Sequence, residues 1–416
     1  MKPVLMDTYL EDINTYEFSE EPLILQSEYF NIKILKAVEE LGGKIDLKPI
    51  LTGSAQSLAY TQFSKYFKSR QTLTVEEKKK FVEHYLAHCG FGKISLRSIS
   101  NKGGHAEMLS DHYASAWVKY FGKRSTDQPG VGYFTCGFLC GVIEAIFDVP
   151  PGTFDSKQTK CISKGDDKSR FEAFRGLKRK LNPSPGFGKQ QEEDEPLTDT
   201  SGINDQKVIG SIVNLEMSGL GSDSCFIEDF DTTWTKHYAN YHPLVMIRLL
   251  MQAEKKLGKG GIAHIRKIFT EAAEGNAYFT LGKILNSPFW VENVAANLDS
   301  DFNSMWHACL DIMTGFGHGK WELAEGSSTE YKVNVINNPE TNAFLKLVGN
   351  TKAPLGYCTG GFLTGVANYV RQNPKPTAVD QDFVEQMRSS KGDISYKEEQ
   401  SRMIGSEKDM LMILVH

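Results

Sequence analysis

The chain has 416 residues, 47 of them basic and 52 acidic, so its formal net charge is −5. This length suits two or three domains, and the acidic balance gives no electrostatic reason to expect nucleic acid as a partner. The seven cysteines are odd in number and scattered, which favours reduced thiols in a cytoplasmic protein. Since no stretch approaches about 18 uninterrupted apolar residues, we expect no membrane span.

The first part of the chain predicts helices, a hairpin, two more helices and a second hairpin. Residues 30–43 carry apolar side chains at helical spacing and end in Gly-Gly, typical of a helix C-terminus. Residues 74–89 open with Thr74 and Glu77 at the spacing of a capping box. The other expected elements are a helix over 51–67, a strand over 93–100, helices over 110–122 and 132–148, and paired strands over 153–163 and 169–174. This order predicts an α+β fold, with helices on an antiparallel sheet.

The same series of segments occurs twice. The decapeptide GYFTCGFLCG at 132–141 returns as GYCTGGFLTG at 356–365. The other matching segments are 35–43 with 251–259, 51–67 with 269–285, 87–96 with 312–323, 114–122 with 341–349 and, faintly, 161–171 with 388–398. One order with small length changes indicates duplication of a domain of roughly 150 residues.

The repeat divides the chain into five parts. We expect domains over 29–175 and 239–400, a lead-in over 1–28 and a C-terminal tail over 401–416. The intervening residues 176–238 read as a linker, partly disordered because of its Pro, Gly and charge blocks, with a strand over 208–217. Because a homodimer interface is two-fold, two fused copies are expected to pack as an intramolecular pseudo-dimer.

The glycines of the decapeptide form a stripe on one helix face in each copy. Gly137 and Gly141 are four residues apart, as are Gly361 and Gly365. Each interior helical glycine costs about 1 kcal/mol relative to alanine, so something close to the helix axis should compensate. A neighbouring helix or sheet is the interpretation we favour, and a bound ligand is the alternative.

The order Gly-Phe-Gly, strands, then G-Y-x-x-G-F-x-x-G and a Cys-x-x-x-Gly strand resembles the 4-vinyl-reductase domain family. Residues 29–175 and 239–400 both carry the resemblance. The family includes a bacteriochlorophyll-biosynthesis protein and sensor domains of some phenol-responsive transcription activators. Its fold is shared with haem-based nitric-oxide sensors and small subunits of the TRAPP tethering complex. The resemblance therefore implies a domain with a pocket for a small molecule.

The resemblance also bears on zinc, which lies beside the ligand pocket in the phenol-sensing members. The corresponding positions are read as Cys136, Gln158, Cys161 and Ser169 in the first copy, and as Gly360, Glu385, Arg388 and Tyr396 in the second. Zinc favours thiolate and imidazole ligands, so the cation Arg388 argues against zinc in the second copy. In the first copy Cys136 and Cys161 are the candidate ligands, with buried core thiols as the favoured alternative. No cofactor is firmly expected.

The function expected from these observations is small-molecule binding without catalysis, as in a sensor or carrier, with an apolar pocket for a hydrophobic or aromatic ligand. The expected ligand-binding residues are Tyr133, Cys136, Gly137, Phe138, Gly141, Tyr357, Gly361, Phe362 and Gly365. The sequence contains no phosphate-loop, dinucleotide-binding or nucleophile-elbow motif. An enzyme or accessory acting on a tetrapyrrole or aromatic metabolite is one alternative. A scaffold with vestigial pockets is another. A sensor of this kind would pass its signal to a protein partner.

Overall fold

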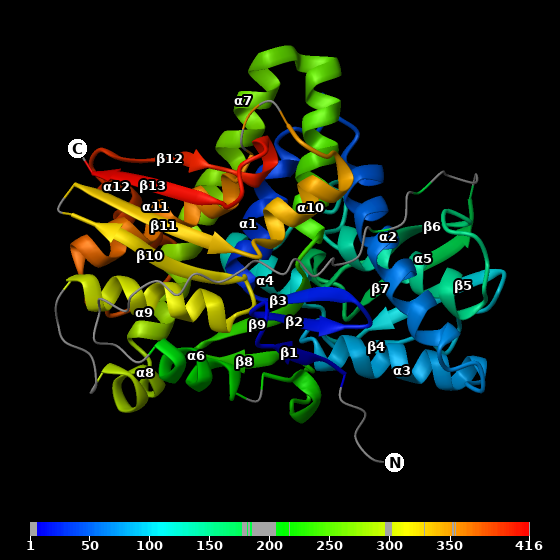
Figure 1. Cartoon of the computed structure of the whole chain (residues 1–416). Coiled ribbons are helices and arrows are strands. Elements are labelled where there is room, and N and C mark those ends of the chain that lie inside the picture. Colours follow the sequence, from blue (N-terminus) through cyan, green and yellow to red (C-terminus); the bar gives the residue numbers. More distant parts are fainter. Residues whose placement is uncertain are drawn as a thin grey trace.

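Figure 1 shows the computed structural model, which describes residues 6–176, 181, 184, 205–215, 217–295, 302–327, 329–351, 353 and 355–415. Its strands form three antiparallel sheets, on which the helices pack, so the predicted α+β class is confirmed. Of the linker expected over 176–238, residues 177–180, 182–183, 185–204 and 216 lie outside the described residues, whereas residues 205–238 contain a helix and two strands and are not a disordered linker. Within the described part, no helix is long and apolar enough to cross a membrane.

The first half of the chain builds one sheet and the helices on it. The sheet has the strand order β4-β5-β7-β6. Its strands are β4 (Ile94–Ser95), β5 (Gly103–Met108), β6 (Phe154–Lys160) and β7 (Ser169–Arg175). The helices are α1 (Glu28–Glu39), α2 (Leu47–Lys68), α3 (Val75–His88), α4 (His112–Phe121) and α5 (Tyr133–Ile146). The capping box predicted at the start of α3 is present, with Thr74 and Glu77 each bonded to the other's backbone.

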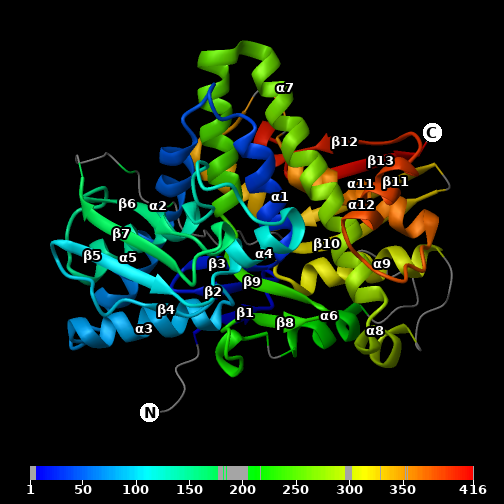
Figure 2. The ribbon, with the colours of Figure 1, turned by 180° about the vertical axis from the view of Figure 1, so that it is seen from behind.

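The second half repeats this arrangement at the other side of the molecule (Figures 1 and 2). Its sheet has the order β10-β11-β13-β12. The strands are β10 (Lys320–Gly326), β11 (Glu330–Ile336), β12 (Ile394–Gln400) and β13 (Met410–Val415). The helices are α6 (Asp205–Val213), α7 (Tyr241–Leu285), α8 (Pro288–Asn293), α9 (Phe302–Gly315), α10 (Pro339–Leu347), α11 (Tyr357–Gln372) and α12 (Gln381–Ser389). Helix α7 breaks at Gly258, whose φ is 63°. Its two arms occupy the same places in the order of elements as α1 and α2 of the first half.

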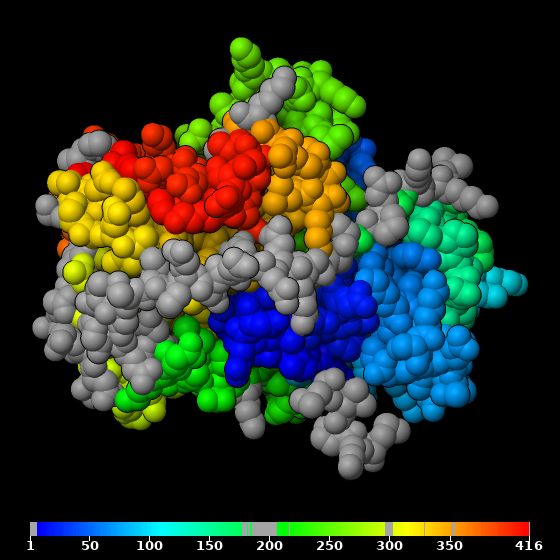
Figure 3. All heavy atoms as spheres, viewed as in Figure 1, coloured from blue at the N-terminus to red at the C-terminus, as the bar shows by residue number. Residues whose placement is uncertain are grey.

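A third sheet joins the halves through strands that precede each copy. Its order is β1-β2-β3-β9-β8, with β1 (Thr8–Leu10), β2 (Thr15–Phe18), β3 (Glu21–Ser27), β8 (Ile227–Asp229) and β9 (Thr232–Tyr238). The central pair is antiparallel, and Ile24 lies opposite His237. In the space-filling view of Figure 3 the blue atoms of the N-terminal segment lie below the orange and red atoms of the second half. Buried apolar residues of both halves belong to one hydrophobic cluster.

Two segments differ from the sequence-based expectation. The strand expected over 208–217 is the helix α6, because Val208, Ile209 and Ile212 are buried at helical spacing and Ile212 packs on Gly315 of α9. The tail expected over 401–416 contains β13, which pairs with both β11 and β12. The sheet of the second half therefore extends beyond residue 400, and β13 completes it.

The match of 161–171 with 388–398 is also wrong. A bulged strand, a single 3-10 turn and a left-handed glycine precede the last strand of each half, with Gly165 at φ 95° and Gly405 at φ 92°. This pattern places 161–171 opposite 401–411. Residues 388–398 come earlier because the second half carries an additional helix, α12, between α11 and β12.

Candidate functional site

The two glycine stripes are contact faces between helices. In the first half α5 lies on α2, and a Cβ added to Gly137 would overlap the carbonyl oxygen of Thr52. In the second half α11 lies on α7, and a Cβ on Gly361 would overlap the carbonyl oxygen of Thr270. The next turn repeats the contact, since a Cβ on Gly365 would be 2.6 Å from that of Ala277. The neighbouring helix fills this face, which is the packing interpretation favoured from the sequence.

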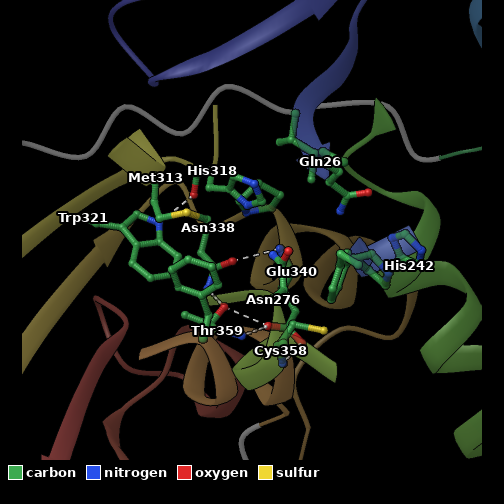
Figure 4. Close-up of a pocket in the computed structure, with 17 residues that line it drawn as sticks. Gln26, His242, Asn276, Met313, His318, Trp321, Asn338, Glu340, Cys358 and Thr359 are labelled. Carbon is green, nitrogen blue, oxygen red and sulfur yellow. Dashed lines mark hydrogen bonds between the residues drawn. The ribbon is translucent and has the colours of Figure 1, made fainter. Parts of the chain in front are cut away.

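A cavity of about 70 Å³ lies beside α11, where the second half meets β3 and the start of α1 (Figure 4). Its apolar wall is formed largely by Phe30, Met313, Trp321 and Phe362. Since one water molecule needs only about 10–15 Å³ of such space, the cavity has room for several water-sized groups. Only Phe362 among the expected ligand-binding residues lines it.

Two buried polar atoms in this cavity lack a partner. Gln26 on β3 is 5% exposed and His242 on α7 is 4% exposed. Within the described residues, neither Gln26 Oε1 nor His242 Nδ1 has a hydrogen-bond partner. A buried polar group without a partner costs about 1–3 kcal/mol. Such groups in a cavity are therefore positions at which a ligand or water gains a hydrogen bond.

Glu340 forms the polar end of the cavity and holds the start of α11. Its carboxylate accepts hydrogen bonds from the backbone N–H of Cys358 at 3.0 Å and from the backbone N–H and hydroxyl of Thr359 at 3.0 and 2.8 Å. The N-cap residue of α11, Gly356, supplies no side chain for this purpose. Burial raises the pKa of Glu340, although these hydrogen bonds oppose the shift. The side chain thus replaces an ordinary N-cap.

The cavity exists in the second half because two aromatic side chains of the first half have smaller counterparts there. The decapeptides align Phe134 with Cys358, and the preceding helices align Tyr113 with Glu340. In the first half the Phe134 ring stacks on Phe91 at 4.8 Å, and the Tyr113 hydroxyl lies 2.9 Å from Nε2 of His237. The corresponding cavity of the first half measures only about 10 Å³.

The remaining expected ligand-binding residues are dispersed. Tyr133 lines the small first-half cavity. Phe138 is buried in the core, edge-on to Phe63 at 5.7 Å. Tyr357 lies beneath the guanidinium of Arg266, which is 5.6 Å from its ring centre. Sequence reasoning missed Gln26 and His242, whose positions in the cavity follow from strand pairing between the halves.

Of the four first-half positions read as zinc ligands, Gln158 and Ser169 lie together, with Nε2 of Gln158 donating to the Ser169 hydroxyl at 3.3 Å. Cys136 is buried on α5, and burial raises the pKa of its thiol to about 12. Cys161 is buried as well, with its sulfur 3.0 Å from the hydroxyl of Ser163. Across the described residues, no group of three or more His, Cys, Asp or Glu side chains is placed to hold a metal ion.

The second-half zinc positions need correction because their alignment was wrong. The strand pattern makes Glu398 the counterpart of Gln158: each accepts the backbone N–H of the glycine before its decapeptide helix at 2.9 Å, Gly132 for Gln158 and Gly356 for Glu398. By the same register, Ser401 and Asp409 correspond to Cys161 and Ser169. Arg388 belongs to the additional helix α12, so it has no first-half counterpart.

His242 should make the unfolding free energy of the chain depend on pH, and substituting this residue measures its share of that dependence. Burial lowers its pKa to about 3, whereas an unfolded histidine titrates near about 6.5. The neutral ring's contribution is therefore present above about pH 6.5 and is lost as the pH falls toward 3. Between pH 7 and 5, the wild-type unfolding free energy should fall by about 2 kcal/mol relative to that of His242→Gln. Urea unfolding of both proteins measures this, and a pH-independent difference would contradict it.

Comparison with known proteins yields likeness in structure only. No protein-family model matches the chain, and no curated protein matches it. Among solved structures, the chain is similar to the phenol-responsive sensory domain of the transcription activator PoxR, solved with phenol. The sequence identity is 13% and the TM-score 0.32, over 41% of this chain and 85% of that one. The likeness thus spans less than half of the present chain.

Proposed function

We propose that this chain is a non-catalytic small-molecule-binding protein whose ligand occupies the cavity between α11, β3 and α7. The observation that carries the proposal is a largely apolar cavity lined by two residues, Gln26 and His242, whose buried atoms Oε1 and Nδ1 have no partners among the described residues. A ligand with an apolar or aromatic body and one hydroxyl satisfies both features. Small-molecule sites generally combine an apolar lining with a few such polar groups.

We further infer that the two halves are tandem 4-vinyl-reductase-like domains packed as an intramolecular pseudo-dimer. The antiparallel pairing of β3 with β9 supports a two-fold arrangement, because these strands hold the same place before each copy. The aligned decapeptide helices support the duplication. In this proposal only the cavity of the second half is open to a ligand, and a protein partner responds to whether that cavity is occupied.

Exchanging residues between the copies tests the cavity. Cys358→Phe introduces the first-half residue, and we expect its ring to fill the cavity and abolish binding without lowering the unfolding free energy. Cys358→Ala is the matched control, since it leaves the cavity open. Isothermal titration calorimetry with phenol and with benzene, which differ by one hydroxyl, provides the measurement. Phenol should bind more tightly than benzene to both wild type and Cys358→Ala.

Two results would overturn the proposal. One is equal phenol binding by Cys358→Phe and wild type, which would place the phenol elsewhere. The other is the failure of wild type to bind either probe saturably while extraction of the purified protein releases no small molecule.

A further inference from the structure

A second cleft, of about 280 Å³, separates α1 of the first half from α7 and α12 of the second. Figure 2 shows α1 beside α7 in the view from behind. The polar side chains of this α1–α7 cleft that can donate hydrogen bonds are Tyr29, Lys33, Lys36, His264, Lys267 and Arg388. They come from three helices, and none of them lines the cavity discussed above.

Tyr29 forms the floor of the cleft and holds its hydroxyl in a fixed place. Its ring stacks on Phe279 at 4.8 Å and meets Tyr120 edge-on at 5.5 Å. The residue is 1% exposed, and its hydroxyl has no hydrogen-bond partner within the described residues. Burial raises its pKa, so the hydroxyl stays protonated and has a proton to donate to an acceptor.

Arg388, on α12, carries a second unused donor, and its guanidinium lies near the Tyr29 hydroxyl. Its Nη1 lies 3.2 Å from a carboxylate oxygen of Glu385, and its Nη2 donates to the carbonyl oxygen of Glu271 at 2.8 Å. Its Nε is buried and has no partner among the described residues. A Cβ added to Gly275 of α7 would lie 2.9 Å from Arg388 Nη2 and 3.4 Å from the Tyr29 hydroxyl. The missing side chain at Gly275 therefore leaves room for the Arg388 guanidinium and the Tyr29 hydroxyl to lie near one spot.

Ammonium groups surround this spot. The Lys33 ammonium lies 5.3 Å from the centre of the Tyr29 ring and 5.5 Å from that of Phe121. Burial, assisted by Arg388 and Lys36, lowers the pKa of Lys33, while Glu385 opposes this. Neither Lys33 nor Lys36 forms an ion pair among the described residues, whereas Lys267 faces Glu271 at 3.7 Å. Cations thus outnumber carboxylates in a chain that is acidic overall.

We propose that the α1–α7 cleft is a binding site for a small phosphate-bearing anion. The unused groups of Tyr29 and Arg388 are both donors, and the surrounding ammonium groups are donors without acceptor capacity. A phosphate group presents several acceptor oxygens and negative charge, and charge-assisted hydrogen bonds to it are the strong ones. Because α1 belongs to one half and α7 and α12 to the other, a bound phosphate would bridge the halves.

Calorimetric titration of the full chain with inorganic phosphate tests the site. Tyr29→Phe keeps the ring contacts and removes the unpaired hydroxyl, so its melting temperature without phosphate should not fall. Its phosphate affinity should drop about tenfold, the effect of one hydrogen bond to a charged group. Lys33→Gln should also weaken binding. Lys255→Gln removes the same charge from an exposed position of α7 outside the cleft, and its affinity should match that of wild type.

The phosphate could belong to a soluble compound or to a lipid headgroup, and vesicles separate these sources. Phosphatidylcholine vesicles containing phosphatidic acid should bind wild type but not Tyr29→Phe if the headgroup is the ligand. Binding of inorganic phosphate without vesicle binding assigns a soluble ligand. Absence of saturable phosphate binding to wild type in both assays, or equal affinities of wild type and Tyr29→Phe, overturns the proposal. Neither result bears on the phenol titration, so the two proposals fail independently.

Discussion

Replacing Gly137 or Gly361 with leucine should lower the free energy of unfolding by about 3 kcal/mol or more, the upper range for overpacked cores. The helices α5 and α2, like α11 and α7, approach so closely that even a Cβ would overlap a backbone carbonyl oxygen of the facing helix. A backbone atom within a helix cannot rotate away as a flexible side chain can. Chemical denaturation of each variant gives the loss directly.

Gly260→Leu is the matched control for this loss. Gly260 also lies in a helix, α7, but nothing stands within 4 Å of its would-be Cβ, so the variant should unfold at wild-type stability or above. Gly130, a glycine outside the helices, is unsuitable as a control because its Cβ would overlap the Gln158 side chain. If Gly361→Leu kept its stability and lost only phenol binding, the stripe would be part of a ligand site after all.

Removing the carboxylate of Glu340 should be the second large effect. Glu340→Ala leaves the backbone N–H groups of Cys358 and Thr359 buried without acceptors, and it enlarges the neighbouring cavity. At about 1–3 kcal/mol for each unsatisfied group, the expected loss is about 3 kcal/mol or more. Urea unfolding at pH 7 gives the loss, and faster hydrogen exchange at the first turn of α11 locates it.

The control for Glu340 is a carboxylate of the same half that caps no helix. Glu399 is exposed on β12, so Glu399→Ala removes the same charge and should change the unfolding free energy by less than about 0.5 kcal/mol. Equal stability of Glu340→Ala and Glu399→Ala would show that α11 does not depend on this cap.

Much of the fold could be predicted because it depends on local patterns. The duplicated decapeptide, the capping box at Thr74 and the helices of the first half all follow from residues within a few turns of one another. Where the signal was weak, the prediction failed. The last hairpin of the second half was misaligned because residues 390–393, directly after the additional helix α12, match by chance the sequence before β7.

The sequence by itself determined that two similar runs of segments exist and that each has a glycine stripe, because spacing along a helix is a local property. Only the tertiary structure decided what each stripe meets and where a cavity opens. Gln26 and His242 are far apart in the chain and reach one cavity through the pairing of β3 with β9. Whether that space is filled depends on side-chain volumes from several segments, such as Cys358 where the first half has Phe134, and no single segment carries that information.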